Sequence, residues 1–197
     1  MQRFHALTLM ESFAKTQAPT STMKDDPQWF ALKVSRKESL ATSILERAGL
    51  RTYCPMAATD TTIQGKKVIV ERPLIPNTVF VFAPFRKLNA LKNLHPFITY
   101  CYKKQDGKFK ILQVPTREMD LFIDSSTKMK EDITYFHPDE VELKQGDRVK
   151  IVGGLFDGYE GTLLKAKGRA KRMFLINFEM LGALGTHIEP QYIKVIK

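Results

Sequence analysis

The chain has 197 residues, of which 43% are hydrophobic, and a formal net charge of +10 at pH 7. Nothing in it approaches 18 consecutive apolar residues, so the sequence predicts no membrane-spanning helix. The beginning of the chain also lacks the charge pattern and cleavage site of a secretory signal. Cys54 and Cys101 match neither a disulfide framework nor a metal-binding pair. We therefore expect two buried thiols and a cytoplasmic location.

The sequence gives no support for an enzyme, a metal site or a cofactor. The four histidines are scattered singly, without metal-binding spacing. No nucleophile elbow and no phosphate-binding loop occurs. Two basic regions flank an acidic stretch, and this distribution favours contact with nucleic acid or with an acidic protein surface. General solubility is the other explanation of the positive charge.

The first predicted domain, residues 27–126, follows a tail at residues 1–26. Strands are predicted at 29–34, 51–54, 77–82 and 98–102, and helices at 40–48, at 86–94 and from Thr116. Ser35 and Glu38 have the spacing of a capping box before the first helix. The run at 77–82 is apolar throughout, which suits a central strand covered on both faces. This β-α-β-β-α-β order predicts an α+β fold with a ferredoxin-like α/β sandwich.

Two turns are predicted to connect extended arms within this domain. Gln64-Gly65 lies between two extended segments, and Asp106-Gly107 is followed by a returning strand at 109–112. After the last helix, residues 127–142 are polar and acidic. They predict an interdomain linker on which Tyr135 and Phe136 dock.

The second predicted domain, residues 143–197, alternates short strands with turns. Strands are predicted at 148–152, 159–165, 172–178 and 186–188, with a last strand at 193–196 that would close a small β-barrel. Gly154, Gly158 and Gly161 permit backbone angles that side chains forbid. Phe156 lies between them and has a suitable size to plug the end of a narrow barrel. These four residues are therefore predicted to build the fold.

Two basic turns are candidates for nucleic-acid binding. One carries Lys66 and Lys67. The other has five cations in eight residues and no acid, namely Lys165, Lys167, Arg169, Lys171 and Arg172. Such a turn can lie along phosphates or along an acidic protein surface. A solvated loop explains each turn equally well.

Several stretches resemble the NusG family of transcription elongation factors. Trp29-Phe30-Ala31-Leu32 resembles an opening Trp-Tyr-x-Leu, and Pro55-Met56 resembles the Pro-Met after the second strand. Residues 73–81, Pro-Leu-Ile-Pro-Asn-Thr-Val-Phe-Val, are similar to the family's Pro-Leu-Phe-Pro-Gly-Tyr-Val-Phe-Val. Residues 146–161 resemble the KOW motif. Asn77 replaces the usual Gly, as it does in RfaH, an operon-specific antiterminator. Residues 114–123 and 135–140 resemble the UpxY antiterminators of Bacteroides.

This resemblance implies a factor that binds RNA polymerase through its N-terminal domain. In the family, that domain contacts the clamp helices of the β′ subunit, bridges towards the β subunit, stabilises the closed clamp and suppresses pausing and termination. The UpxY likeness adds an association with capsular or exopolysaccharide operons. Six residues are implied to lie in or near the polymerase contact, namely Phe30, Tyr53, Pro55, Ile75, Thr78 and Phe80. Their pattern alone indicates core residues.

The resemblance also implies further partners. Met180 and Leu181 fall where the KOW domain of general NusG binds Rho or a small-subunit ribosomal protein. Arg36, Lys37, Lys66 and Lys67 are candidates for contact with non-template DNA, and nascent RNA is another possible ligand. Two alternatives stay open, a general NusG that acts with Rho and an RNA- or ribosome-associated KOW protein.

Overall fold

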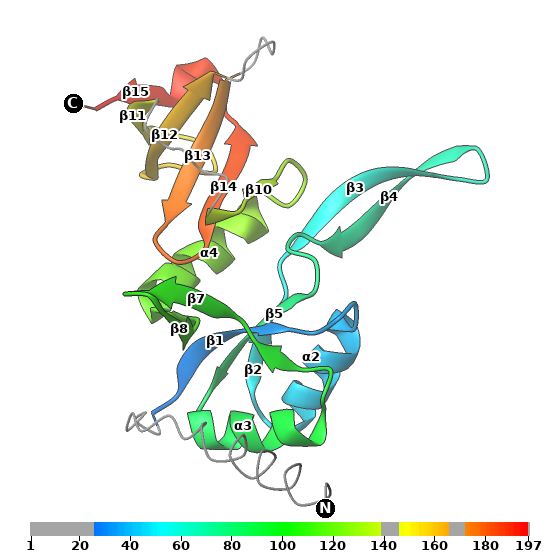
Figure 1. Cartoon of the computed structure of the whole chain (residues 1–197). Helices are drawn as coiled ribbons and strands as arrows, with labels where there is room; N and C mark the ends of the chain where they lie inside the picture. The colour runs from blue at the N-terminus through cyan, green and yellow to red at the C-terminus, as the bar shows by residue number, and fades with distance from the viewer. Residues whose placement is uncertain (1–25, 139–145, 166–171, 197) are drawn as a thin grey trace, which may run out of the picture.

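The structure, a computed structural model, describes residues 26–138, 146–165 and 172–196. Figure 1 shows two sheets at opposite ends of the molecule with one long helix between them and a two-stranded hairpin that projects to the side. The predicted mixture of helices and strands is therefore confirmed.

The N-terminal sheet is built around two central strands. Its order is β2-β5-β1-β6, and β9 also pairs with β1. The strands are β1 (Gln28–Lys33), β2 (Arg51–Tyr53), β5 (Thr78–Ala83), β6 (Thr99–Tyr100) and β9 (Gln113–Val114). Helix α2 (Glu38–Arg47) joins β1 to β2, and α3 (Phe85–Leu94) follows β5. All the pairings are antiparallel, which gives the strand arrangement of a split β-α-β fold.

Both faces of β1 and β5 are buried, as their apolar runs predict. Phe30 and Val81 are paired and lie in one cluster with residues of α2 and α3. Ala31 and Phe80 are also paired and belong to the other cluster, which includes Phe122 of α4 (Thr116–Lys128). Because side chains alternate along a strand, Phe30 and Phe80 point to opposite faces of the sheet.

The predicted capping box at the start of α2 is wrong. Ser35 and Arg36 instead form a left-handed turn, with φ of 46° and 62°. The Glu38 carboxylate accepts a 2.7 Å hydrogen bond from the backbone N–H of Asn77, and the Asn77 side chain accepts a 2.6 Å bond from Arg36 N–H. Two hydrogen bonds between Asn77 and the turn that begins α2 therefore take the place of the predicted cap. Asn77 itself has φ of 62°, a left-handed angle that asparagine adopts more readily than most residues.

Two hairpins form at the predicted turns. Strands β3 (Met56–Ile63) and β4 (Lys66–Pro73) pair along their full length around Gln64-Gly65 and project from the body (Figure 1). Strands β7 (Tyr102–Gln105) and β8 (Lys108–Ile111) pair around Asp106-Gly107. Each hairpin forms its own two-stranded sheet, so neither widens the N-terminal sheet.

The C-terminal sheet is open, and the predicted barrel closure is not confirmed. Its order is β10-β14-β13-β12-β11-β15. The strands are β10 (Thr134–Phe136), β11 (Asp147–Ile151), β12 (Glu160–Lys165), β13 (Arg172–Phe178), β14 (Gly182–His187) and β15 (Ile193–Val195), with a 3-10 turn η2 (Pro190–Tyr192) before the last. The short β15 adds to β11, while β10 takes the opposite edge. Within the described parts of the chain, no ladder joins these two edges.

Strand β10 comes from the segment predicted to be a linker. Its Tyr135 pairs with Leu184 of β14, so this part of residues 127–142 docks on the C-terminal sheet. Residues 139–142 lie outside the described residues. The hydrophobic cluster on the outer face of the N-terminal sheet also continues through Phe122 into Phe174 and Leu184, so the two predicted domains share one core.

The glycines after β11 have two different roles. Gly154 and Gly158 have left-handed φ angles of 72° and 84°, as predicted. Gly161 lies in β12 without a left-handed angle, and a Cβ there would overlap the Leu175 carbonyl oxygen and the Phe174 ring. Phe156 is buried and its ring meets that of Tyr159 edge-on, 5.8 Å away.

Candidate functional site

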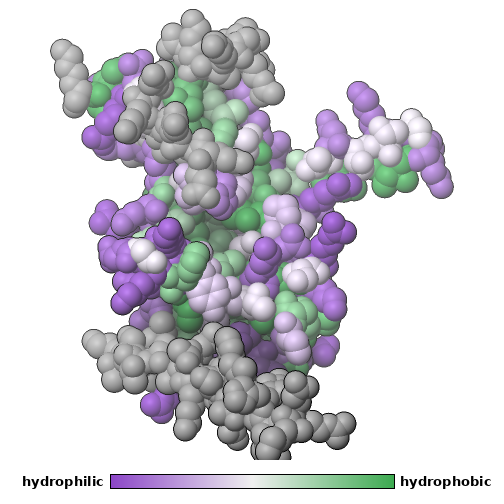
Figure 2. Space-filling view, viewed as in Figure 1, coloured by the Kyte–Doolittle hydropathy of each residue, from purple (hydrophilic) through white to green (hydrophobic). Residues whose placement is uncertain are grey.

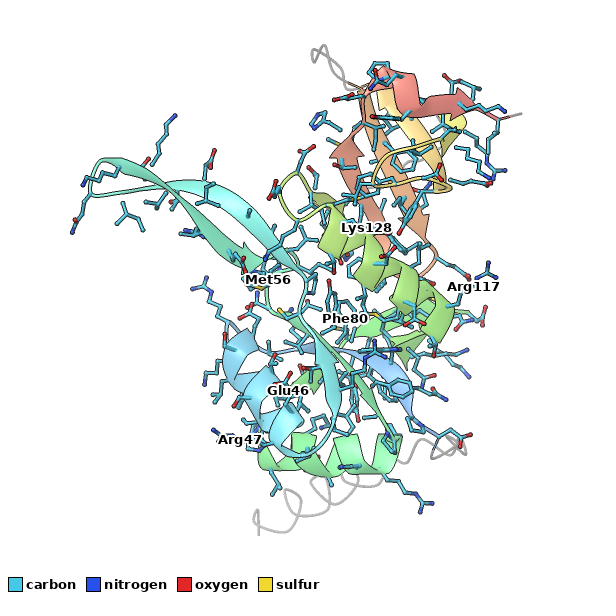
Figure 3. All side chains as sticks on the ribbon, turned by 180° about the vertical axis from the view of Figure 1, so that it is seen from behind. Glu46, Arg47, Met56, Phe80, Arg117 and Lys128 are labelled. Carbon is cyan, nitrogen blue, oxygen red and sulfur yellow. The ribbon has the colours of Figure 1, made fainter. Side chains whose placement is uncertain are left out.

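The face of the N-terminal sheet opposite α2 and α3 is covered by helix α4. The ring of Phe80 packs edge-on against Phe122 with centroids 5.7 Å apart, and Figure 3 shows Phe80 in the layer beneath α4. Tyr53 of β2 joins the same layer through a 2.7 Å hydrogen bond between its hydroxyl and that of Ser126. Apolar strand faces and the apolar stripe of α4 therefore form one packed layer at this face.

The six residues implied to contact a partner divide into buried and accessible groups. Phe30 and Phe80 are each 1% exposed, and Pro55 is buried. Phe30 is a core residue under α2 and α3, on the wrong face to join the others. Tyr53, Ile75 and Thr78 keep part of their surface exposed.

On the face of the N-terminal sheet that α4 covers, the partly exposed apolar side chains lie next to the edge strand β2. Tyr53, Leu74 and Ile75 are partly buried and pack against the cluster that contains Phe80. We call these three residues the β2-edge patch. The patch lies beside α4, to which Tyr53 bonds, and at the base of the β3–β4 hairpin, which begins at Met56 and ends at Pro73. Tyr53 and Ile75 are among the predicted contact residues, and Leu74 adds to them.

The C-terminal sheet is docked on the outer side of α4. Phe122 meets Phe178 of β13 edge-on, with ring centroids 5.2 Å apart. The Tyr159 hydroxyl donates to the Asp124 carboxylate, and Lys128 Nζ lies 2.9 Å from the same carboxylate. Helix α4 is therefore packed on both sides, by one sheet on each.

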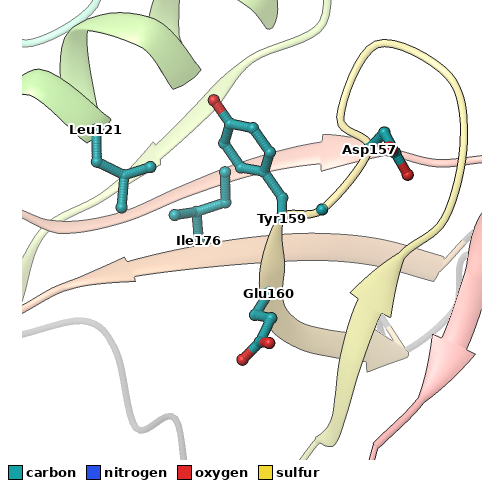
Figure 4. Close-up of a pocket in the computed structure, with 6 residues that line it drawn as sticks. Leu121, Asp157, Tyr159, Glu160 and Ile176 are labelled. Carbon is teal, nitrogen blue, oxygen red and sulfur yellow. The ribbon is translucent and has the colours of Figure 1, made fainter.

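A crevice remains along this junction. It has a volume of about 450 Å³ and lies between Leu121 of α4 and Tyr159 and Ile176 of the C-terminal sheet (Figure 4). Apolar side chains and the loop that carries Asp157 line it. Helix α4 and the C-terminal sheet therefore pack against each other over only part of their length.

The predicted partner-binding pair of the C-terminal domain faces the same junction. Leu181 is buried, and the backbone N–H of Met180 donates a 2.7 Å hydrogen bond to Glu118 of α4. Burial raises the pKa of Glu118, while hydrogen bonds from the backbone of Met180 and Leu181 act to lower it. On the other side, Lys103 Nζ of β7 lies 2.8 Å from Met180 Sδ. Leu181 is therefore covered by the chain itself, and Met180 is partly covered.

A second polar junction follows the end of α4. The Asp132 carboxylate accepts hydrogen bonds from the His187 backbone N–H at 2.9 Å and from the Thr186 hydroxyl at 3.2 Å, and it lies 2.9 Å from His187 Nδ1. Partial burial acts to raise the pKa of Asp132, but the bonds from His187 and Thr186 outweigh it and lower that pKa. Asp132 therefore favours its charged form at this contact.

The carboxylates of α4 that contact the C-terminal domain, Glu118 and Asp124, were not predicted as site residues. Glu118, Leu121, Asp124 and Lys128 are spaced by three, three and four residues, which places them along one side of a helix. That spacing was available in the sequence. The spacing predicts a helix face with polar and apolar residues, but the surface that packs on this face cannot be predicted from the spacing.

The candidate nucleic-acid residues form separate groups, and one group lies near the β2-edge patch, because Arg36 N–H bonds to Asn77, two residues after Ile75. Arg36 and Lys37 are exposed at the turn before α2, and Lys66 and Lys67 are exposed at the tip of the β3–β4 hairpin. Figure 2 shows that this hairpin is mostly hydrophilic, with a small hydrophobic area near its tip. Lys167, Arg169 and Lys171 lie outside the described residues. Lys165 and Arg172 end β12 and begin β13, and their side chains are likewise outside the description.

The two thiols are poorly suited to nucleophilic chemistry. Burial, and secondarily the Glu38 carboxylate, raises the pKa of Cys54 to about 11, and burial also raises the pKa of Cys101. A thiol with a raised pKa holds little of the reactive thiolate. In the part of the chain that the structure describes, no cluster of His, Cys, Asp or Glu could hold a metal ion, and no helix is long and apolar enough to cross a membrane.

Comparison with known proteins finds a family similarity in the first half of the chain. Residues 27–123 match the family model NusG, described as transcription termination factor nusG. A solved structure described as domain interaction in Thermotoga maritima NusG is 17% identical, with a TM-score of 0.48, over 87% of this chain and 98% of that chain. A MjSpt4:Spt5 complex is 14% identical, with a TM-score of 0.25, over 86% of this chain and 97% of that chain. Residues 27–123 of this chain are therefore similar to the NusG family.

Proposed function

We propose that this protein is a non-enzymatic elongation factor that binds RNA polymerase through the β2-edge patch. The observation that carries the proposal is that Tyr53, Leu74 and Ile75 expose apolar surface next to α4 within a domain similar to the NusG family. Exposed apolar clusters on a globular domain commonly mark partner sites. The helical pair of the β′ clamp is the partner that the sequence resemblance implies.

The proposed mechanism is a bridge across the polymerase cleft. A rigid domain that contacts the clamp helices on one side and the β subunit on the other binds the closed clamp better than the open one. Such a ligand shifts the equilibrium by its difference in affinity for the two states. A difference of about 1.4 kcal/mol changes the ratio of closed to open clamp roughly tenfold. Paused and terminating states, which need an open clamp, become less populated.

The specialised role that we propose is antitermination on long operons, of the capsular or exopolysaccharide kind. Its support is the likeness of residues 114–123 and 135–140 to the UpxY antiterminators, together with Asn77 in the turn before β5. Arg36, Lys37, Lys66 and Lys67 are exposed cations that would contact non-template DNA beside the polymerase.

The docking of the C-terminal sheet on α4 limits the access of a partner protein to Met180 and Leu181. Leu181 is buried and Met180 is partly covered by contacts with α4 and β7, so Rho or a ribosomal protein would reach the whole pair only after the sheet leaves α4. The same departure would uncover the outer side of α4, where Phe122 now meets Phe178. We propose that polymerase binding and release of the C-terminal sheet favour each other.

Transcription of a long template by purified polymerase, with and without Rho, tests the function. The protein should increase readthrough in both reactions, and Ile75→Asp should lose the effect because it puts a charge in the apolar contact. Leu94→Asp is the matched control, since Leu94 is 73% exposed at the end of α3 and away from the patch. Increased termination only when Rho is present would identify a general NusG instead. No effect in either reaction, combined with binding to ribosomes, would favour the KOW-type RNA or ribosome partner and contradict the proposal.

A further inference from the structure

The β7–β8 hairpin carries exposed aromatic rings that the proposed function does not use. Tyr102 is 58% exposed and Phe109 is 76% exposed. Large rings contribute most to stability when they are buried, and neighbouring exposed rings often mark a binding surface. The hairpin is therefore a candidate interaction surface.

The register of the hairpin places both rings on one face with a lysine. Lys104 pairs with Phe109, and Tyr102 pairs with Ile111. Because alternate side chains share a face, Tyr102, Lys104 and Phe109 lie on the same side. Directly opposed residues have Cβ atoms about 5 Å apart and diagonal neighbours are about 7–8 Å apart. Lys104 is thus directly opposite Phe109, and it lies on the same face of β7 as Tyr102. We call these three residues the hairpin face.

The charge of the hairpin is strongly positive. Lys103 and Lys110 are paired on the other side, and Lys108 follows the turn. Asp106 is the single acidic residue between Tyr102 and Ile111, and its carboxylate lies 3.8 Å from Lys110 Nζ with both side chains well exposed. An exposed pair of this kind neutralises little of the field of four lysines.

The root of the hairpin is fixed, and the hairpin face is open. Cys101 N–H donates to the Ala31 carbonyl at 2.9 Å, and Leu112 N–H donates to the Cys101 carbonyl at 2.8 Å, which ties the hairpin to β1. Lys103 reaches Met180 of the C-terminal sheet, so the opposite side of the hairpin is the one turned towards that sheet. Where Figure 1 draws β7 and β8, Figure 2 shows hydrophilic surface around a small hydrophobic group.

We propose that the hairpin face binds single-stranded nucleic acid, with bases stacked on Tyr102 and Phe109 and a phosphate held by Lys104. Aromatic rings in a basic groove bind single strands without strong sequence preference, because every base has a flat face. A protein partner fits less well, since lysine is depleted in protein interfaces. Bases in a duplex are already stacked, so a duplex offers only its phosphates. The inference does not depend on the polymerase contact, because it concerns binding by the chain alone.

Fluorescence anisotropy of the full chain with labelled oligodeoxythymidylate and oligouridylate of about 12 nucleotides tests this binding. Tyr102→Ala and Phe109→Ala should each weaken binding about fivefold or more, which is the loss expected for one stacked base. Phe109→Tyr, which keeps the ring, should bind as the wild type does. Leu94→Ala is the matched control for loss of an exposed apolar side chain. Both rings are largely exposed, so their removal opens no cavity, and unchanged circular dichroism would establish that the variants fold.

The salt dependence separates stacking from charge. Lys104→Ala should reduce the slope of log affinity against log salt by about 0.7, whereas the ring variants should leave the slope unchanged. Tighter binding of the DNA strand would identify an exposed DNA strand as the ligand, and tighter binding of the RNA strand would identify a transcript; both support the proposal. Equal binding of wild type and Tyr102→Ala/Phe109→Ala would overturn it, and so would equal affinity for a duplex. Unchanged oligonucleotide binding with weakened polymerase binding would assign the hairpin face to a protein partner instead.

Discussion

The contact between Phe122 and Phe178 links helix α4 to the C-terminal sheet and gives the sharpest prediction about the fold. Both rings are buried, their centroids are 5.2 Å apart and their planes are inclined by 77°. An edge-on pair of this kind contributes about 0.5–1.5 kcal/mol beyond the burial of its area. Replacement of either ring by leucine keeps much of the volume, so the swap itself costs about 1.5 kcal/mol or less. Each single variant loses the ring–ring energy as well.

The double variant Phe122→Leu/Phe178→Leu loses the ring–ring energy only once. Its loss of unfolding free energy should therefore be smaller than the sum of the two single losses by about 0.5–1.5 kcal/mol. Urea unfolding of the four proteins, followed by circular dichroism, measures this difference. Phe82→Leu combined with Phe178→Leu is the control, because Phe82 packs against Trp29 and no ring contact joins it to Phe178 among the described residues. Additivity of the Phe122 and Phe178 losses to within about 0.3 kcal/mol would refute the docked arrangement in solution.

Two further predictions concern the C-terminal sheet. Gly161→Ala should destabilise the protein by about 3 kcal/mol, because its Cβ meets the Leu175 backbone, whereas Gly158→Ala, with open space and a left-handed φ of 84°, should cost about 1 kcal/mol. Equal losses in urea unfolding would contradict the two roles assigned to these glycines. Asp132→Asn should reduce stability mainly above about pH 4, because a carboxyl whose folded pKa is lowered stabilises the fold above its unfolded pKa and loses that contribution as the pH falls through the folded value. Unfolding curves from pH 7 to pH 3 should show the difference from wild type shrinking, and a constant difference would rule out this role for Asp132.

Much of the N-terminal domain was predictable because its patterns are local. The apolar runs of β1 and β5 correctly predicted strands buried on both faces, and both hairpin turns formed where Gln64-Gly65 and Asp106-Gly107 occur. The capping box failed because Glu38 found a partner 39 residues away, at Asn77. A local motif competes with such long-range bonds, and the sequence does not reveal which of them wins.

The candidate site was less predictable, because it depends on which surfaces meet. Phe30 and Phe80 both match the family pattern, yet neighbouring registers place them on opposite faces of one sheet. Barrel closure also depends on pairing between distant edges, and β10 rather than β15 took the edge beside β14. The packing of α4 between two sheets brings together residues whose polar and apolar spacing was visible but whose partners were not.

The affinity of the protein for purified RNA polymerase, compared with the affinities of Ile75→Asp and Leu94→Asp, shows whether polymerase binds at the β2-edge patch. Ile75 lies in the β2-edge patch and is only partly buried, so the charge should leave the fold intact while it disrupts an apolar contact. We expect the wild type and Leu94→Asp to bind, and a folded Ile75→Asp to bind at least tenfold more weakly, a loss of about 1.4 kcal/mol or more. Equal affinity for all three proteins would show that polymerase does not bind at this patch.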